Sequence, residues 1–190
     1  HISMGDVPSD IMDILEEEAT EDNEKMPAIT PGDKPYLKTG VLETWKSRIP
    51  WLLLLMVSAT FTGKIIASYE SALGACMVLS TFIPMLMDTG GNAGSQASVS
   101  IIRGISLDEI RFRDLAKVVW KELRVSLLCG ITLAAANFVK LMLFDKTGLT
   151  VAAVICLTLV ATVFVAKIVG AILPMLAKRA GVDPAVMASP

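Results

Sequence analysis

Long apolar runs separated by short charged segments constrain the fold of this chain more than any other feature. The runs cover about residues 49–69, 73–103, 123–144 and 149–176. The first would extend roughly 31 Å as a helix, and the hydrocarbon core of a bilayer is about 30 Å thick. Lipid offers no hydrogen bonds to exposed backbone groups, so such segments cross it as helices. The sequence therefore predicts an all-α, polytopic membrane protein with four transmembrane helices within residues 49–190.

The composition supports this class and narrows the chemistry. Hydrophobic residues make up 53% of the chain and charged residues 19%, and the charges gather between the apolar runs. The three cysteines share no motif spacing, and the only histidine is His1. A zinc or copper site is therefore disfavoured, and any bound metal would need oxygen ligands. We expect no enzyme, because the apolar runs hold neither a second deep carboxylate nor a Ser/His pair, and no nucleic-acid partner.

The N-terminal segment is polar and acidic. Residues 1–4 have the character of an expression remnant, and residues 5–48 predict a short acidic cytoplasmic helix followed by a proline-containing linker. The first forty residues contain no apolar signal segment. A membrane protein of this kind normally begins in the cytoplasm, so we expect a cytoplasmic N-terminus.

Basic residues in the short loops favour the same orientation in the cell membrane. If the chain starts inside, the basic residues before the first run, between the second and third, and after the fourth all lie on the cytoplasmic side. They are Lys46, Arg48, Arg103, Arg111, Arg113, Lys117, Lys121, Arg124, Lys178 and Arg179.

The segment between the second and third runs predicts an amphipathic connector helix at the membrane surface. Ser106 and Glu109 have the spacing of a capping box, which would open this helix. Leu107, Leu115 and Val118 belong to its apolar side, and basic residues lie among them.

The second run is too long for one straight crossing, and helix-breaking residues fill its middle. Pro84 cannot donate a backbone N–H, and Gly90, Gly91 and Gly94 follow within ten residues. We therefore expect a helix that is broken between Pro84 and Gln96 and that faces protein or a water-filled cavity.

Polar side chains in this segment repeat every four residues. Asp88, Asn92 and Gln96 would share one helical face, which Ser80 and Ser100 extend. Carboxylate, amide and hydroxyl oxygens are the ligands that Mg²⁺ and Ca²⁺ prefer. An ionisable residue deep in a membrane segment indicates a functional site. The small residues are equally suited to close helix packing, and that alternative stays open.

Lys167 is the other charge deep in an apolar run. Its ammonium group would neutralise a carboxylate or repel cations in a vestibule. Alternatively, its long side chain reaches back to the membrane surface.

The pattern Pro84-x-x-x-Asp88-Thr-Gly-Gly-Asn92-Ala-Gly-x-Gln96 resembles the signature of the MgtE family of magnesium channels and transporters. The similarity continues through Ile102-Arg103-Gly104, Gly170-Ala-Ile-Leu-Pro174 and Gly181-Val-Asp-Pro-Ala185. It implies a homodimeric, Mg²⁺-selective channel whose pore is lined by the second and fifth transmembrane helices. The residues that match the motif, and are expected to line the metal path, are Asp88, Gly90, Gly91, Asn92 and Gln96.

The resemblance also implies parts that these 190 residues do not contain. The family has an N-terminal domain, paired CBS modules and a fifth transmembrane helix, which we expect to lie outside this sequence. An acidic stretch resembles the region that binds regulatory Mg²⁺, and its residues are Glu16, Glu17, Glu18, Glu21 and Asp22. Two alternatives remain at this point: an ion-coupled secondary transporter of divalent cations, and a membrane assembly protein that transports nothing.

Overall fold

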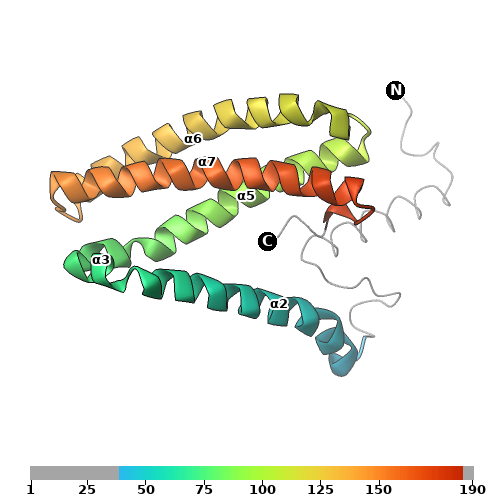
Figure 1. The fold of residues 1–190 in the computed structure, drawn as a ribbon, viewed down its shortest axis with the longest axis horizontal. Helices are drawn as coiled ribbons and strands as arrows, with labels where there is room; N and C mark the ends of the chain where they lie inside the picture. The colour runs from blue at the N-terminus through green and yellow to red at the C-terminus, as the bar shows by residue number, and fades with distance from the viewer. Residues whose placement is uncertain (1–38, 186–190) are drawn as a thin grey trace, which may run out of the picture.

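The computed structural model describes residues 39–185, and every regular element in that range is helical (Figure 1). The predicted all-α class is therefore confirmed. In chain order the elements are α2 (Val41–Ser68), α3 (Glu70–Ala75), α4 (Met77–Thr81), α5 (Ile83–Ser106), the 3₁₀ turn η2 (Phe112–Asp114), α6 (Leu115–Leu143) and α7 (Leu149–Arg179).

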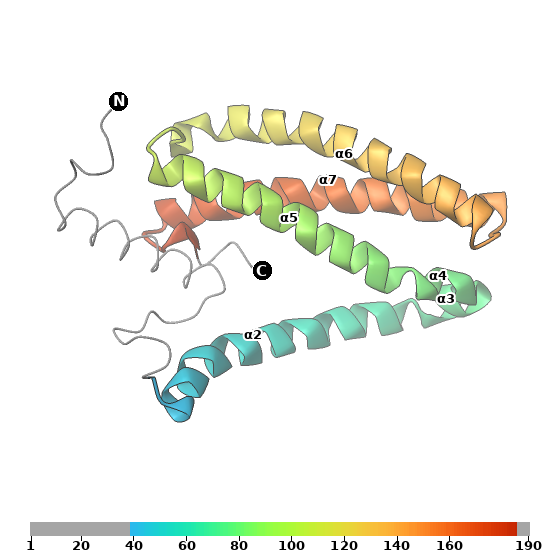
Figure 2. The ribbon, with the colours of Figure 1, turned by 180° about the vertical axis from the view of Figure 1, so that it is seen from behind.

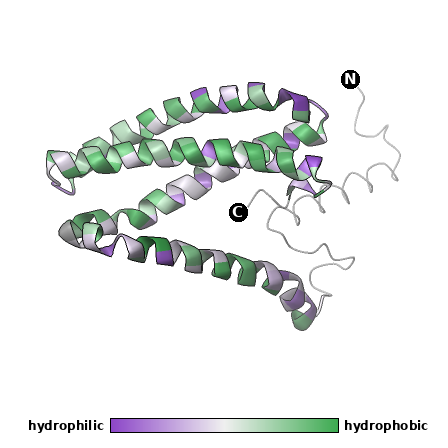
Figure 3. Cartoon of the chain, viewed as in Figure 1, coloured by the Kyte–Doolittle hydropathy of each residue, from purple (hydrophilic) through white to green (hydrophobic). Residues whose placement is uncertain are grey.

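Three segments of the described chain are long and apolar enough to cross a membrane: α2, η2 together with α6, and α7. They correspond to the first, third and fourth predicted spans. Helix α5 has 24 residues, but its middle is polar (Figure 3). A fourth crossing by α5 stays a prediction.

Helix α7 is the centre of the packed core. It contacts α5 and α6 along much of its length, whereas α5 and α6 scarcely contact each other. Figure 1 shows α5 crossing α7 diagonally, with α6 running beside α7. Most of the buried apolar residues form three clusters along α7: Phe82, Leu141, Ala152 and Ile155 at one end, Ala93, Leu159 and Val163 in the middle, and Ile101, Val118, Ala171 and Met175 at the other end.

Helix α2 stands apart from this core. The short helices α3 and α4 form a corner between α2 and α5, and the two long helices diverge away from it (Figure 2). None of the residues of α2 is buried. Large apolar side chains such as Leu54, Met56 and Phe61 are more than half exposed, at 55%, 60% and 63%. A helix with this surface is suited to lipid or to another protein segment.

The second apolar run is interrupted, but not where the sequence predicts. Helix α5 is continuous from Ile83 to Ser106, so the expected break between Pro84 and Gln96 is wrong. The interruptions lie earlier, at Cys76 and at Phe82. Pro84 occupies the first turn of α5, where a missing N–H costs no intrahelical hydrogen bond.

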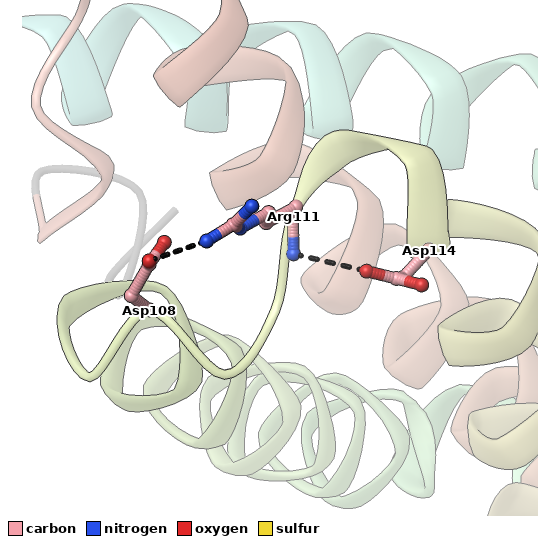
Figure 4. A network of polar contacts seen from close by, with 3 residues as sticks. All are labelled: Asp108, Arg111 and Asp114. Atoms are coloured by element: carbon pink, nitrogen blue, oxygen red, sulfur yellow. Dashed lines mark hydrogen bonds and ion pairs between the residues drawn. The ribbon is translucent and has the colours of Figure 1, made fainter.

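The predicted capping box at Ser106 is also wrong, and so is a connector helix beginning there. Ser106 is the last residue of α5, and Asp108 follows in a left-handed conformation with φ of 55°. The next helical segment begins after Arg111, whose backbone N–H donates a 3.4 Å hydrogen bond to Asp114 Oδ2 (Figure 4). The amphipathic stretch therefore forms η2 and the first turns of α6. Of its predicted apolar side, Val118 is buried, whereas Leu107 is 56% exposed.

The beginning of α2, the connection between α5 and α6, and the end of α7 lie at the same end of the structure (Figure 1). The three groups of basic residues identified in the sequence belong to these three places. The predictions for residues 1–4, for the acidic helix and for Glu16, Glu17, Glu18, Glu21 and Asp22 lie outside the described residues.

Candidate functional site

Helix α5 has two faces of different character. One packs on α7, and its buried residues between positions 90 and 98 are small: Gly90, Ala93, Ala97 and Ser98. The opposite face, which we call the polar face of α5, carries four exposed residues of the predicted site: Asp88, Gly91, Asn92 and Gln96. The fifth predicted residue, Gly90, is separated from the others because it faces α7.

The glycines of the buried face allow α5 and α7 to approach closely. A Cβ atom on Gly170 of α7 would collide with the carbonyl oxygen of Gly94 and lie 2.9 Å from its carbonyl carbon. A Cβ atom on Gly90 would lie 2.8 Å from Thr162 Cγ2. Gly91, on the other face, has no such neighbour within 4 Å. Close packing therefore explains Gly90 and Gly94, whereas it does not explain Gly91.

A buried hydrogen bond joins the two helices beside this contact. The Ser98 hydroxyl donates to the carbonyl oxygen of Gly170 at 2.7 Å. Pro174 lies four residues after Gly170 inside α7 and has no N–H to offer that oxygen. Ser98 thus supplies the donor that the helix lacks, and it is not among the site residues predicted from the sequence. The sequence signal for this hydrogen bond is a serine in one apolar helix together with a proline inside another.

The polar face of α5 looks into a cleft between α5 and α6, with α7 as its floor, which we call the α5–α6 cleft. Two cavities of about 690 Å³ and 540 Å³ occupy it. Asn92 and Gln96 from α5 and Lys167 from α7 line both cavities. The structure therefore brings two predicted amide ligands and the deep lysine together. Asp88 lies one turn before Asn92, outside the lining of these two cavities.

The donor set of this region favours a hydrated hard cation over a transition metal. Within the described residues, no three side chains of the His, Cys, Asp and Glu type lie close enough together to hold a metal. Asp88 belongs to no such cluster, and the amide side chains of Asn92 and Gln96 follow it on the polar face of α5. Ser100 lines the larger cavity, whereas Ser80 belongs to α4 and does not extend the same helical face.

Glu122 of α6 also lines the larger cavity, and it is not among the site residues predicted from the sequence. Its Oε2 atom is buried and has no hydrogen-bond partner among the residues described. A single acidic residue between Lys121 and Arg124 had the pattern of an ordinary helix surface. Only the packing of α6 on α7 turns it toward the cleft.

An ion pair fixes the loop at the end of α5. The Arg111 guanidinium donates a 2.7 Å hydrogen bond to Asp108 Oδ2 (Figure 4). This hydrogen bond, with the positive charge of Arg111, lowers the pKa of Asp108 below its ordinary value. Both side chains are largely exposed, so the pair orders the loop more than it stabilises the fold.

The MgtE family, described as divalent cation transporters, matches residues 83–190 of the chain. The chain is also similar to three curated proteins named Magnesium transporter MgtE. It is 39% identical over 181 residues to the one from Thermus thermophilus and 30% identical over 185 residues to the one from Bacillus subtilis. It is 25% identical over 181 residues to the one from Enterococcus faecalis.

Each of these alignments covers 95% of this chain. The chain spans about 40% of the length of these relatives. The matched residues include all of α5, with its polar face and its small-residue face, and both helices that pack around it. With a family match over more than half its length, this chain belongs to the MgtE family, a family of divalent cation transporters rather than enzymes.

Proposed function

We propose that this chain is the membrane-spanning part of a homodimeric, Mg²⁺-selective channel and that the polar face of α5 lines its ion path. The observation that carries the proposal is the division of α5 into two faces. Small residues hold one face against α7, and Asp88, Asn92 and Gln96 remain exposed on the other. Polar and charged side chains inside a membrane face protein or water rather than lipid, because exposing them to hydrocarbon is costly.

A second copy of the chain is the proposed partner on the exposed side of α5. Within residues 39–185, Asp88 does not belong to any group of three or more His, Cys, Asp and Glu side chains that could hold a metal. A symmetric dimer around α5 would bring two copies of Asp88 and Asn92 to one axis and would double the number of oxygen ligands. The unburied surface of α2 leaves room for further contacts with that copy or with lipid.

The membrane potential supplies the driving force in this proposal. The basic ends of α2, α6 and α7 face the cytoplasm, which puts the N-terminal side of α2 inside. Moving one charge through 100 mV releases about 2.3 kcal/mol, so a divalent cation gains about 4.6 kcal/mol without coupling to protons or sodium. The relatives named as magnesium transporters support Mg²⁺ as the cargo.

The close packing of Gly90 and Gly94 on α7 fits the alternative of a membrane assembly protein. That alternative does not explain why polar residues are exposed on the other face of α5. A passive channel needs that face, and an ion-coupled transporter would need it as well. The two transport mechanisms differ in their response to voltage and to a proton or sodium gradient.

The test is Mg²⁺ uptake into liposomes that contain the natural-length protein, with the potential set by a potassium gradient and valinomycin. Uptake should follow the potential, ignore proton and sodium gradients, and fall at least about tenfold in Asp88→Ala and Asn92→Ala. Unchanged uptake in both variants would remove the polar face of α5 from the path. Uptake that requires a proton or sodium gradient would identify a coupled transporter.

A further inference from the structure

Lys167 is buried in the packed core formed by α5, α6 and α7. Its residue surface is 6% exposed, and it lines both cavities of the α5–α6 cleft. Its side chain makes no hydrogen bond or ion pair with any residue between 39 and 185. An ammonium group in such a place is costly unless an anion or water compensates it.

Glu122 is the complementary group in the same cleft. It lines the larger cavity together with Lys167, and its buried Oε2 lacks a donor among the described residues. The two side chains do not form an ion pair with each other. Opposite charges that share a cavity without contact leave room for something between them.

The space between these charges is suited to a hydrated cation. The larger cavity, of about 690 Å³, is also lined by Asn92, Ser95 and Gln96. Their oxygen atoms can accept hydrogen bonds from the water shell of a divalent cation, and Mg²⁺ keeps several of its waters when it binds protein. The volume exceeds by far the roughly 30 Å³ share of one water molecule, so an ion can enter with its shell.

We propose that Glu122 is a cation ligand in the α5–α6 cleft and that the ammonium group of Lys167 competes with the cation for the carboxylate of Glu122. Without a bound cation, the ammonium group of Lys167 compensates the carboxylate of Glu122. A divalent cation that enters beside Asn92 and Gln96 binds this carboxylate. The positive charge of Lys167 repels the cation, and this repulsion keeps the affinity of the cleft for the cation low and allows its release. The idea rests on the proposed cation path along α5 and adds a regulator to it.

The charges give the proposal a definite sign. With Lys167 and Glu122 both present, their charges cancel, whereas Lys167→Gln leaves −1 and Glu122→Gln leaves +1. Because a divalent cation responds doubly to each change, Lys167→Gln should strengthen Mg²⁺ binding and Glu122→Gln should weaken it, each by roughly tenfold or more. Lys167→Arg keeps the charge and should bind nearly as the unmodified protein does.

The experiment measures the thermal unfolding midpoint of the natural-length protein in nanodiscs against MgCl₂ concentration, at constant ionic strength. The half-saturating Mg²⁺ concentration is compared among the unmodified protein, Lys167→Gln, Lys167→Arg and Glu122→Gln. Lys146→Gln and Glu109→Gln remove the same charges from exposed loop positions and serve as matched controls. The cleft variants should shift the half-saturating concentration in opposite directions, and the controls should leave it unchanged.

Shifts in the same direction, or shifts no larger than those of the controls, would overturn the proposal. A loss of stability in both cleft variants with unchanged Mg²⁺ dependence would identify a purely structural charge pair and would also overturn it. The Mg²⁺ uptake of the unmodified protein is measured separately. A protein that transports Mg²⁺ but fails this test refutes the role of Lys167 alone, whereas one that neither binds nor transports Mg²⁺ refutes the proposed function.

Discussion

Ser98 donates its hydroxyl to the carbonyl oxygen of Gly170 at 2.7 Å, and Gly170 is the residue that Pro174 leaves without an intrahelical donor. One side chain of α5 thereby completes the backbone of α7. The relationship fixes the rotation of α5, because the face that carries Ser98 must point at α7. The polar face, on the other side of the helix, is directed away from α7 for the same reason.

Ser98→Ala should lower the free energy of unfolding by about 1 kcal/mol, because it leaves a buried carbonyl oxygen without a donor. Pro174→Ala restores an N–H that can reach the same oxygen. We therefore expect Ser98→Ala to cost less in the Pro174→Ala background than alone. The cavity left by removing the proline ring occurs in both variants of that background and cancels in the double-mutant cycle. Equal costs in both backgrounds, measured by denaturant titration in mixed micelles, would refute the link.

Gly170→Ala should destabilise the protein by about 1–3 kcal/mol, because the new methyl group meets the backbone of Gly94 and forces α5 away from α7. Gly94→Ala should cost less, since its methyl group would lie 3.2 Å from the carbonyl oxygen of Ala166. Gly91→Ala is the matched control. It meets nothing within 4 Å and exchanges glycine for a better helix former, so its stability should be equal or greater. Similar losses in all three variants would argue against the tight crossing.

Arg111→Gln should raise the pKa of Asp108 toward its ordinary value, because the variant removes the charged donor that lowers it. A carboxyl group with a lowered pKa contributes stability above its ordinary pKa and loses that contribution as the pH falls through the lowered value. The two proteins should therefore differ near neutral pH and converge in acid. The difference should be small, since both side chains are exposed. Carbon-detected NMR titration of the Asp108 carboxyl group measures the shift, and an unchanged pKa would contradict the contact.

Much of the fold follows from local sequence patterns. The apolar runs predict α2, α6 and α7, and the fourth predicted span begins at Leu149, as α7 does. Length and apolarity determine these helices without reference to their neighbours. The turn between α6 and α7 also follows from the sequence, since Gly148 and polar residues interrupt the apolar pattern there.

Helix α5 was harder to predict because its continuity depends on contacts with another helix. Glycines at 90, 91 and 94 weaken an isolated helix, but two of them allow α7 to pack closely, and that packing stabilises α5. The sequence predicts that Pro84 breaks a longer helix, whereas α5 begins only at Ile83 and Pro84 lies in its first turn. Ser106 had the sequence of a helix start, yet the left-handed backbone at Asp108 ends α5 there and delays the next helix to Phe112.

The candidate site can be predicted only in part, because some of its residues come together through packing between helices. The four-residue spacing of Asp88, Asn92 and Gln96 predicts one shared face, and all three are exposed on the polar face of α5. Spacing along one helix contains no information on Glu122, which reaches the cleft only because α6 packs on α7. The sequence drew attention to Lys167 as a deep charge, but its cavity depends on three helices.

The most direct test of the account is a cysteine scan of α5 after Cys76, Cys129 and Cys156 have been replaced by serine. Single cysteines at Ser95, Gln96 and Val99, which are exposed and line the larger cavity, report on the polar face. Single cysteines at Ser98 and Ile101, which are buried and line neither cavity, report on the buried face. A charged, membrane-impermeant thiol reagent should block Mg²⁺ flux through the first group, and Mg²⁺ should slow the block. The second group should remain active. Block at both faces, or at neither, would contradict the claim that the polar face of α5 lines the ion path.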